Sequence, residues 1–412
     1  MRQTVMLALT ASLACAGLAR ADAVSEWSLI AQGSIVTVEH KFPGEAAVYM
    51  GIVHAAMYDA AVGIEGGYRP YRVSPTAPRG ASLDAAVATA AHQVLVQLFP
   101  GQQSALDVAY EASLAAIPDG QAKSDGISVG GQVGDGYLDL PAIEGLNATV
   151  PYVQPPPGPG VWEPTAATPP LGTKLPLVVP LTLDDAAQYR PDGPLPLGSH
   201  EYASDVKEVK KLGRVDSTFR TVEQTQTALF WTDHDIPQWN RNLVRLAAER
   251  GLRPAQTARM LAMAHVAGGD AMIACFDAKY HYLSWRPLHA IQRADTDGNP
   301  LTEPDPSWQP LRPTPNHPEY PSAHACHTTA ITVALERFFG TNAVPFSLDS
   351  LVTGETRHYD RLKDVVKEVN NARVWAGFHF RNSDNDGSAL GRKVGRFVAQ
   401  RFFRPTGCHL EE

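Results

Sequence analysis

Residues 45–64 read EAAVYMGIVHAAMYDAAVGI. Apolar side chains recur there every three or four residues, which is the spacing of one face of an α-helix. That face consists of Met50, Val53, Met57, Ala61 and Ile64. A helix so rich in Ala and Met is typical of a protein core. We therefore expect the chain to be built around buried helices.

The same periodicity extends along most of the chain. Ser82 is a favourable N-cap for a second helix, whose apolar face runs from Leu83 to Leu98. Further helices are predicted at about 103–117, 120–138, 199–213, 219–231, 236–250, 254–282, 323–339, 360–371 and 384–403. No repeat of solenoid period is visible. The predicted fold class is all-α.

A proline-rich stretch divides these helices into two groups. Of the 33 prolines, 14 lie between Pro141 and Pro196. Tyr152, Trp162 and the apolar run at 175–181 favour an ordered segment wrapped over the surface rather than a flexible linker. The expected architecture is two helical-bundle halves, 22–140 and 199–412, joined by a proline-rich ordered segment at 141–198. The C-terminal half carries the candidate functional site.

The N-terminus has the pattern of a secretory signal. Arg2 precedes an apolar stretch, and Ala19-Arg20-Ala21 is a small-residue cleavage site. We predict a signal peptide over residues 1–21 and a secreted or periplasmic protein. The apolar stretch is short for a membrane span, so no integral membrane segment is expected. Cleavage removes Cys15, so the other three cysteines allow at most one disulfide, and buried free thiols are expected.

Composition limits the function further. The chain has 412 residues, of which 44% are hydrophobic and 19% charged, which is typical of a core-forming globular protein. Its net charge is −8, and becomes −10 when the leader removes two of the 35 basic residues and none of the 43 acidic ones. This acidity argues against nucleic acid as the main partner. An anion can still bind where cations are gathered locally.

Three fragments of the C-terminal half carry polar residues suited to an anion. They are KYHYLSWRP at 279–287, PSAH at 321–324 and RVWAGFH at 373–379. Ser322 precedes an apolar helical run, so unpaired backbone N–H groups are expected near Ala323 and His324, at the positive end of a helix.

The cations converge under simple geometric conditions. Lys279 and Arg286 are seven residues apart and would share a face of a continuing helix. Arg373 and His379 are six apart and converge only if the helix breaks, for which Gly377 offers a place. Fixed cations, backbone donors and two imidazoles are together suited to holding a tetrahedral oxyanion.

In this order the fragments resemble the signature of the vanadium-dependent haloperoxidase and type 2 phosphatidic acid phosphatase superfamily, K-x6-RP, PSGH and SR-x5-H. HPEYPSAH at 317–324 is especially similar to the bacterial secreted haloperoxidase-like branch. The resemblance implies vanadate as the cofactor. His379 would be its axial metal ligand, and His324 the acid–base partner. The remaining cofactor-binding groups would be Lys279, Arg286, Arg373, Ser322 and the N–H of Ala323, with Lys279 also assisting bound peroxide.

The sequence departs from that signature at three positions. Ala323 replaces Gly, and Ala372 replaces the Ser before the arginine. Many relatives have Asp four residues after the ligating histidine, where this chain has Ser383, followed by Asp384. The residue that orients His379 is therefore not evident.

Three flanking residues have two interpretations each. His317 stands where bromide-oxidising members have a histidine, and is either a residue of the site or a surface loop histidine. Asp270 and Asp277 either pair with the cations or face solvent.

The resemblance implies a peroxidase that uses hydrogen peroxide to oxidise a halide, with bromide or iodide favoured over chloride, and a small organic acceptor. A soluble acid phosphatase with His379 as nucleophile is the alternative, because both activities need the same oxyanion-binding residues. A non-catalytic anion-binding helical protein is a further alternative. The length of the chain before its C-terminal half favours the peroxidase. Exposed helical faces are compatible with a homodimer.

Overall fold

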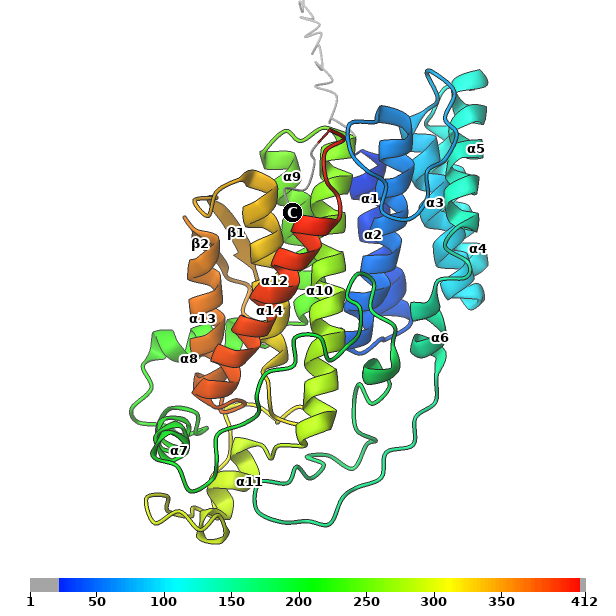
Figure 1. Ribbon diagram of the computed structural model, residues 1–412. Coiled ribbons are helices and arrows are strands. Elements are labelled where there is room, and N and C mark those ends of the chain that lie inside the picture. Colours follow the sequence, from blue (N-terminus) through cyan, green and yellow to red (C-terminus); the bar gives the residue numbers. More distant parts are fainter. Residues whose placement is uncertain (1–21, 408–412) are drawn as a thin grey trace, which may run out of the picture.

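The computed structural model describes residues 22–407, which are mostly helical (Figure 1). The long helices are α1 (Ala23–Gln32), α2 (Pro43–Glu65), α3 (Leu83–Leu98), α4 (Gln103–Ala115), α5 (Gln121–Asp135), α7 (His200–Leu212), α8 (Val222–Phe230), α9 (Asp235–Glu249), α10 (Pro254–Tyr282), α12 (Ala323–Phe339), α13 (Leu362–Trp375) and α14 (Arg381–Arg401). Shorter turns of helix are η1 (Gly33–Val38), η2 (Pro100–Gln102), α6 (Pro141–Asn147), η3 (Leu175–Leu177), α11 (Pro287–Gln292) and η4 (Ala294–Thr296). The predicted all-α class is confirmed.

The structure adds elements that the periodicity did not indicate. A small antiparallel hairpin pairs β1 (Phe346–Asp349) with β2 (Thr356–Tyr359). Four residues are too few to show a strand pattern against a helical background. Helix α1 was also missed; it begins directly after the predicted signal peptide, which lies outside the described residues.

Local signals fixed the ends of several helices well. The bounds of α10 and α12 agree with the prediction to the residue. Ser82 caps α3 as expected, because its hydroxyl accepts the Ala85 N–H at 3.3 Å.

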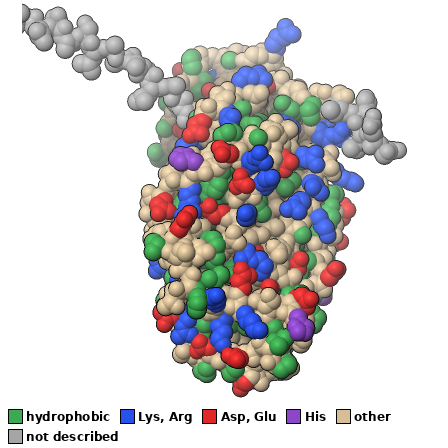
Figure 2. All heavy atoms as spheres, turned by 90° about the vertical axis from the view of Figure 1, so that its left-hand side faces the viewer, with side chains coloured by type: hydrophobic (Ala, Val, Ile, Leu, Met, Phe, Trp, Pro, Cys, Tyr) green, Lys and Arg blue, Asp and Glu red, His purple; other side chains and the backbone are tan. Residues whose placement is uncertain are grey.

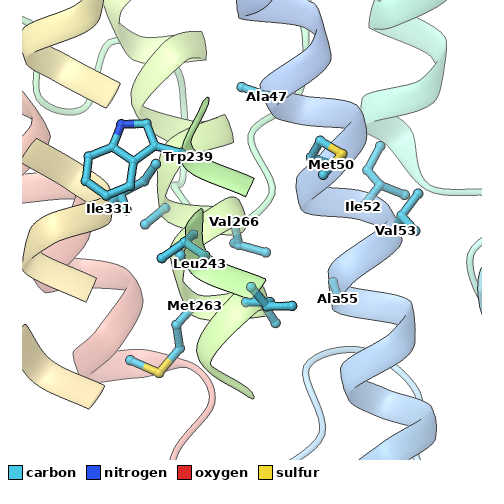
Figure 3. Packing of buried hydrophobic residues seen from close by; sticks show 14 of the residues in the cluster. Ala47, Met50, Ile52, Val53, Ala55, Trp239, Leu243, Met263, Val266 and Ile331 are labelled. Atoms are coloured by element: carbon cyan, nitrogen blue, oxygen red, sulfur yellow. The ribbon is translucent and has the colours of Figure 1, made fainter. Parts of the chain in front are cut away.

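Helix α10 forms the centre of the core, with α2 on one side and α12 and α14 on the other (Figure 1). Figure 3 shows side chains of α2, α9, α10 and α12 packed in one cluster, among them Met50, Trp239, Met263 and Ile331. These four side chains are buried, and each such side chain contributes roughly 1.5–3 kcal/mol to stability. Helix α2 is long and apolar enough to cross a membrane, but 89% of its apolar window is buried inside the protein.

The proline-rich segment is ordered and anchored to α10. Leu181 N–H and Thr182 N–H donate to the Asp270 carboxylate at 2.6 and 2.8 Å. Arg190 forms an ion pair with Asp277 at 2.7 Å. The two aspartates therefore hold the wrapping segment, and neither pairs with the cations of the candidate site.

The surface carries side chains of both charges (Figure 2), and the described cysteines are free. On the face that Figure 2 shows, basic side chains are numerous, but acidic ones lie among them. Cys275 and Cys326 are buried and free, as expected. Cys408 lies outside the described residues.

Candidate functional site

Four helix ends meet near the candidate residues. Helices α10 and α13 end there, and α12 and α14 begin there. The close packing of α14 on α12 depends on Gly391, because a Cβ at this position would lie 2.2 Å from the Cys326 carbonyl oxygen. Because α12 and α14 both begin in this region, their backbone dipoles direct their positive ends toward it.

A turn after α10 brings Arg286 back toward Lys279. The helix ends at Tyr282, and Leu283 takes a left-handed conformation with φ 49°. Arg286 thus lies beyond α10, as the N-cap residue of α11. The two cations converge through this turn and do not share a continuing helix.

The predicted break between Arg373 and His379 is confirmed. Helix α13 ends at Trp375, and Gly377 has φ +78°. A Cβ on Gly377 would lie 2.7 Å from the Gly213 carbonyl oxygen, so both the conformation and the space require glycine.

His379 is held in one tautomer by two neighbours. Its Nδ1 lies 2.8 Å from Oε1 of Glu319, and its Nε2 lies 3.2 Å from Nη1 of Arg286. A guanidinium can only donate, so Nε2 must carry the lone pair and Nδ1 the proton. Burial and then the positive charge of Arg286 hold the pKa of His379 well below its usual value. The neutral ring therefore presents the unprotonated nitrogen that a metal ligand needs.

Glu319 is the functional residue that the sequence did not identify. Its Oε1 also accepts the Phe380 N–H at 3.1 Å, which fixes the carboxylate beside the imidazole. Burial raises the pKa of Glu319 to about 7, although Lys279 and Arg286 lower it. Ser383 is not the residue that orients His379. Its hydroxyl donates to the backbone oxygen of Glu319 at 3.5 Å and not to the imidazole. The only signal in the sequence was an acidic residue inside the HPEYPSAH motif.

The three cations are fully buried. Lys279 Nζ donates to the carbonyl oxygens of Pro318 and Glu319 at 2.9 and 2.8 Å. Arg373 Nη1 donates to the Trp231 carbonyl at 2.8 Å. Burial lowers the pKa of Lys279 to about 8, that of Arg286 to about 9 and that of Arg373 to about 10. Each cation would be stabilised by an anion placed among them.

Unpaired polar atoms test whether an oxyanion fits. Ser322 occupies the N-cap position of α12, but its side chain makes no capping hydrogen bond. His324 Nε2 and Arg373 Nε are buried without a hydrogen-bond partner, whereas the buried Ser322 hydroxyl interacts with the Asp384 carboxylate. Buried polar atoms are normally paired, so the two unpaired atoms in the predicted set are compatible with a ligand between them. A tetrahedral oxyanion, with acceptor atoms on every side, fits this set of donors.

A cavity of about 440 Å³ reaches two residues of the predicted set, His324 and Arg373. His324, Arg373, Phe378 and Asp235 line it. Burial and then the charge of Arg373 lower the pKa of His324 to about 3, so its ring is neutral at ordinary pH. A neutral imidazole at the cavity wall can accept a proton.

Two further acidic groups surround His324 and Arg373 without having been predicted. Asp235 Oδ2 lies 3.0 Å from Nδ1 of His327, one helical turn after His324, and both side chains are 1% exposed. Asp384 is also fully buried, and burial raises its pKa well above the usual value.

His317 lies in the site and not on the surface. It is 5% exposed, and its Nδ1 lies 3.1 Å from Nη2 of Arg286. Its ring packs against Phe42 and Phe276, with ring centroids 5.9 and 5.1 Å away. Of the two interpretations of His317, the surface loop histidine is therefore excluded.

Comparisons with known proteins show what this chain and its fold are similar to. Residues 259–406 match the family model of the VCPO second helical-bundle domain. The fold is similar to that of a bacterial vanadium-dependent iodoperoxidase, with a TM-score of 0.79 and 22% identity over 95% of this chain and 99% of the other.

It is also similar to a bacterial vanadium-dependent chloroperoxidase. The holo-type structure gives a TM-score of 0.68 and 17% identity over 87% of this chain and 92% of the other. The apo-type structure gives 0.66 and 16% over 85% and 92%. No curated protein sequence matches significantly. The resemblance to the vanadium haloperoxidases is thereby confirmed for the fold and for the domain that carries the candidate site.

Proposed function

Because residues 259–406 match the family model of the VCPO second helical-bundle domain, we propose that the protein is a vanadium-dependent haloperoxidase. One observation carries the proposal. The residues of the signature converge, and two of them, His324 and Arg373, keep buried polar atoms without a partner. The residues that would hold vanadate are Lys279, Arg286, Ser322, Ala323, Arg373 and His379, with His324 as the acid–base partner.

Each residue has a role that follows from its contacts. His379 presents Nε2 because Glu319 accepts the Nδ1 proton. The buried cations compensate the charge of the oxyanion, while Ser322 Oγ and the N–H of Ala323 donate to its oxygens. Vanadate, when bound, supplies a Lewis acid that polarises hydrogen peroxide.

His324 would move the proton. Its neutral ring faces the cavity and can accept a proton from an incoming peroxide. Arg373 lowers the pKa of His324, so an anion beside Arg373 would raise that pKa again and make His324 a better base. Lys279 would hydrogen-bond the peroxide.

The substrates are hydrogen peroxide, a halide and a small organic acceptor. We propose bromide or iodide as the halide, since His317 lies against Arg286 in the place that the resemblance associates with bromide oxidation. A secreted or periplasmic location follows from the predicted signal peptide. The boundaries 22–140, 141–198 and 199–412 remain our proposed division of the chain.

The test uses the purified protein with and without orthovanadate. Bromination and iodination of a phenolic dye by peroxide should require vanadate, whereas hydrolysis of an aryl phosphate should be absent. His379→Ala should lose halogenation, and His281→Ala, which changes an exposed histidine, should retain it. Halogenation without vanadate, or no halogenation at all, would refute the proposal. Phosphate hydrolysis that depends on His379 would favour the phosphatase alternative instead.

A further inference from the structure

A second cavity lies behind the ligating histidine. Its volume is about 390 Å³, which is within the range of small-molecule pockets. It is bounded by the proline-rich segment, by α7, and by the turns that carry Ser284, Glu319 and Phe380. Phe380 lines this cavity, whereas Phe378 lines the one beside His324. The two cavities therefore lie on either side of the segment that carries His379.

Backbone hydrogen bonds hold the walls of this cavity in place. Trp162 N–H donates to the Leu283 carbonyl at 2.6 Å, and Trp285 N–H donates to that of Gly160 at 2.9 Å. Glu319 N–H donates to the Ser284 carbonyl at 2.9 Å. Three chain segments are thus joined side by side, so the cavity is a fixed feature of the fold. Such pre-formed pockets are typical of small-molecule sites.

The lining selects for a neutral ligand. Most of the wall is apolar, with aromatic side chains from Tyr202, Trp285 and Phe380. The ionisable acids on it are Asp205 and Glu319, and none of the described residues that line it is Lys or Arg. An anion, whether halide, vanadate or carboxylate, would be repelled. A neutral group that donates a hydrogen bond would be accepted by a carboxylate.

Asp205 is the acceptor best placed for such a group. Its Oδ2 accepts the Asn382 N–H at 2.8 Å, which fixes the orientation of the carboxylate. The side chain is half-buried, and burial raises its pKa. A hydrogen bond to a partly desolvated carboxylate is stronger than one between neutral groups.

We propose that this cavity is a binding site for neutral phenols. The aromatic ring would pack among Leu197, Trp285 and Phe380, and the hydroxyl would donate to Asp205. The site is separate from the oxyanion residues, so phenol binding requires no vanadate and does not rest on the proposed peroxidase function. Glu319 lies on the cavity wall and also contacts His379, so the two sites are adjacent through one carboxylate.

The test measures binding of 4-methylphenol to the full protein without vanadate, by saturation-transfer NMR and titration. We expect saturable binding, with benzoate and cyclohexanol at least about tenfold weaker because one is anionic and the other lacks the ring. Binding by 4-methylphenol that is no tighter than by benzoate would overturn the proposal.

Two variants locate the ligand. Leu197→Trp should fill the cavity and weaken binding at least about tenfold. Leu177→Trp makes the same change in the same segment at a position that is 59% exposed, and should bind normally. Asp205→Asn removes the charge at nearly constant volume, and should weaken 4-methylphenol binding severalfold. Undiminished binding in both Leu197→Trp and Asp205→Asn would refute this location.

Discussion

Replacing Glu319 with Gln should weaken vanadate binding without unfolding the protein. Glu319 Oε1 accepts one hydrogen bond from His379 Nδ1 at 2.8 Å and one from Phe380 N–H at 3.1 Å. Glutamine keeps the shape and an acceptor oxygen but loses the negative charge. The imidazole then keeps only a neutral acceptor, which holds its proton on Nδ1 and its lone pair on Nε2 less firmly.

The magnitude follows from the burial of the pair. The two side chains are 2% and 1% exposed, so solvent screens their interaction little. A hydrogen bond to a charged group contributes about 1.5–3 kcal/mol, against about 0.5–1.5 kcal/mol for a neutral one. The expected loss is therefore about 1–2 kcal/mol, or roughly five- to thirtyfold in the dissociation constant.

Calorimetric titration of the vanadate-free protein with orthovanadate measures this loss directly. Glu336→Gln changes a half-buried glutamate on α12 and serves as the matched control. If Glu319→Gln binds vanadate within twofold of the natural protein, Glu319 does not position His379. If the natural protein binds no vanadate, the proposed cofactor itself is wrong, so the two failures are distinguishable.

Three other substitutions test separate parts of the structure. Gly377→Ala should lower the free energy of unfolding in urea by at least about 1–2 kcal/mol, because its φ is positive and a Cβ would meet the Gly213 carbonyl; an unchanged midpoint would contradict this. Sulfate, which does not titrate near neutral pH, should bind more weakly above about pH 8, where Lys279 loses its proton. The limiting decrease is roughly tenfold per pH unit, and Lys279→Arg should move its onset to higher pH because a guanidinium keeps its proton to higher pH than an amine. His317→Phe should change the ratio of bromide to iodide oxidation rates, and an unchanged ratio would remove His317 from halide selection.

The helices were predictable, and the candidate site residues could be proposed, because their signals are local. Pro254 begins α10 and Gly340 follows α12, and such residues mark helix ends wherever they occur. Gly377 likewise showed where Arg373 and His379 could converge.

The orienting residue was not predictable in this way. Glu319 reaches His379 because the loop before α12 packs against the turn after α13, 60 residues further along the chain. Spacing within a motif carries no information about such a contact. Asp384, which follows the position where relatives have an orienting aspartate, is instead a neighbour of Arg373. The contacts of Asp270 and Asp277 were undecided for the same reason, since they depend on where the proline-rich segment lies.

The acidity of the whole chain and its proposed affinity for an anion are compatible because they act at different distances. Surface charges are screened over about 8 Å at physiological salt, whereas buried charges are screened much less. At the site, the pKa of Lys279 falls from 10.5 to about 8, which corresponds to roughly 3 kcal/mol of lost stability for its charged form. An oxyanion that restores this stability gains binding free energy of the same order from one residue. Burial lowers the pKa of Arg286 and that of Arg373 in the same way. The buried cations therefore attract an anion, because the fold leaves their charges incompletely solvated. The net charge of the surface therefore does not decide whether the site binds an anion.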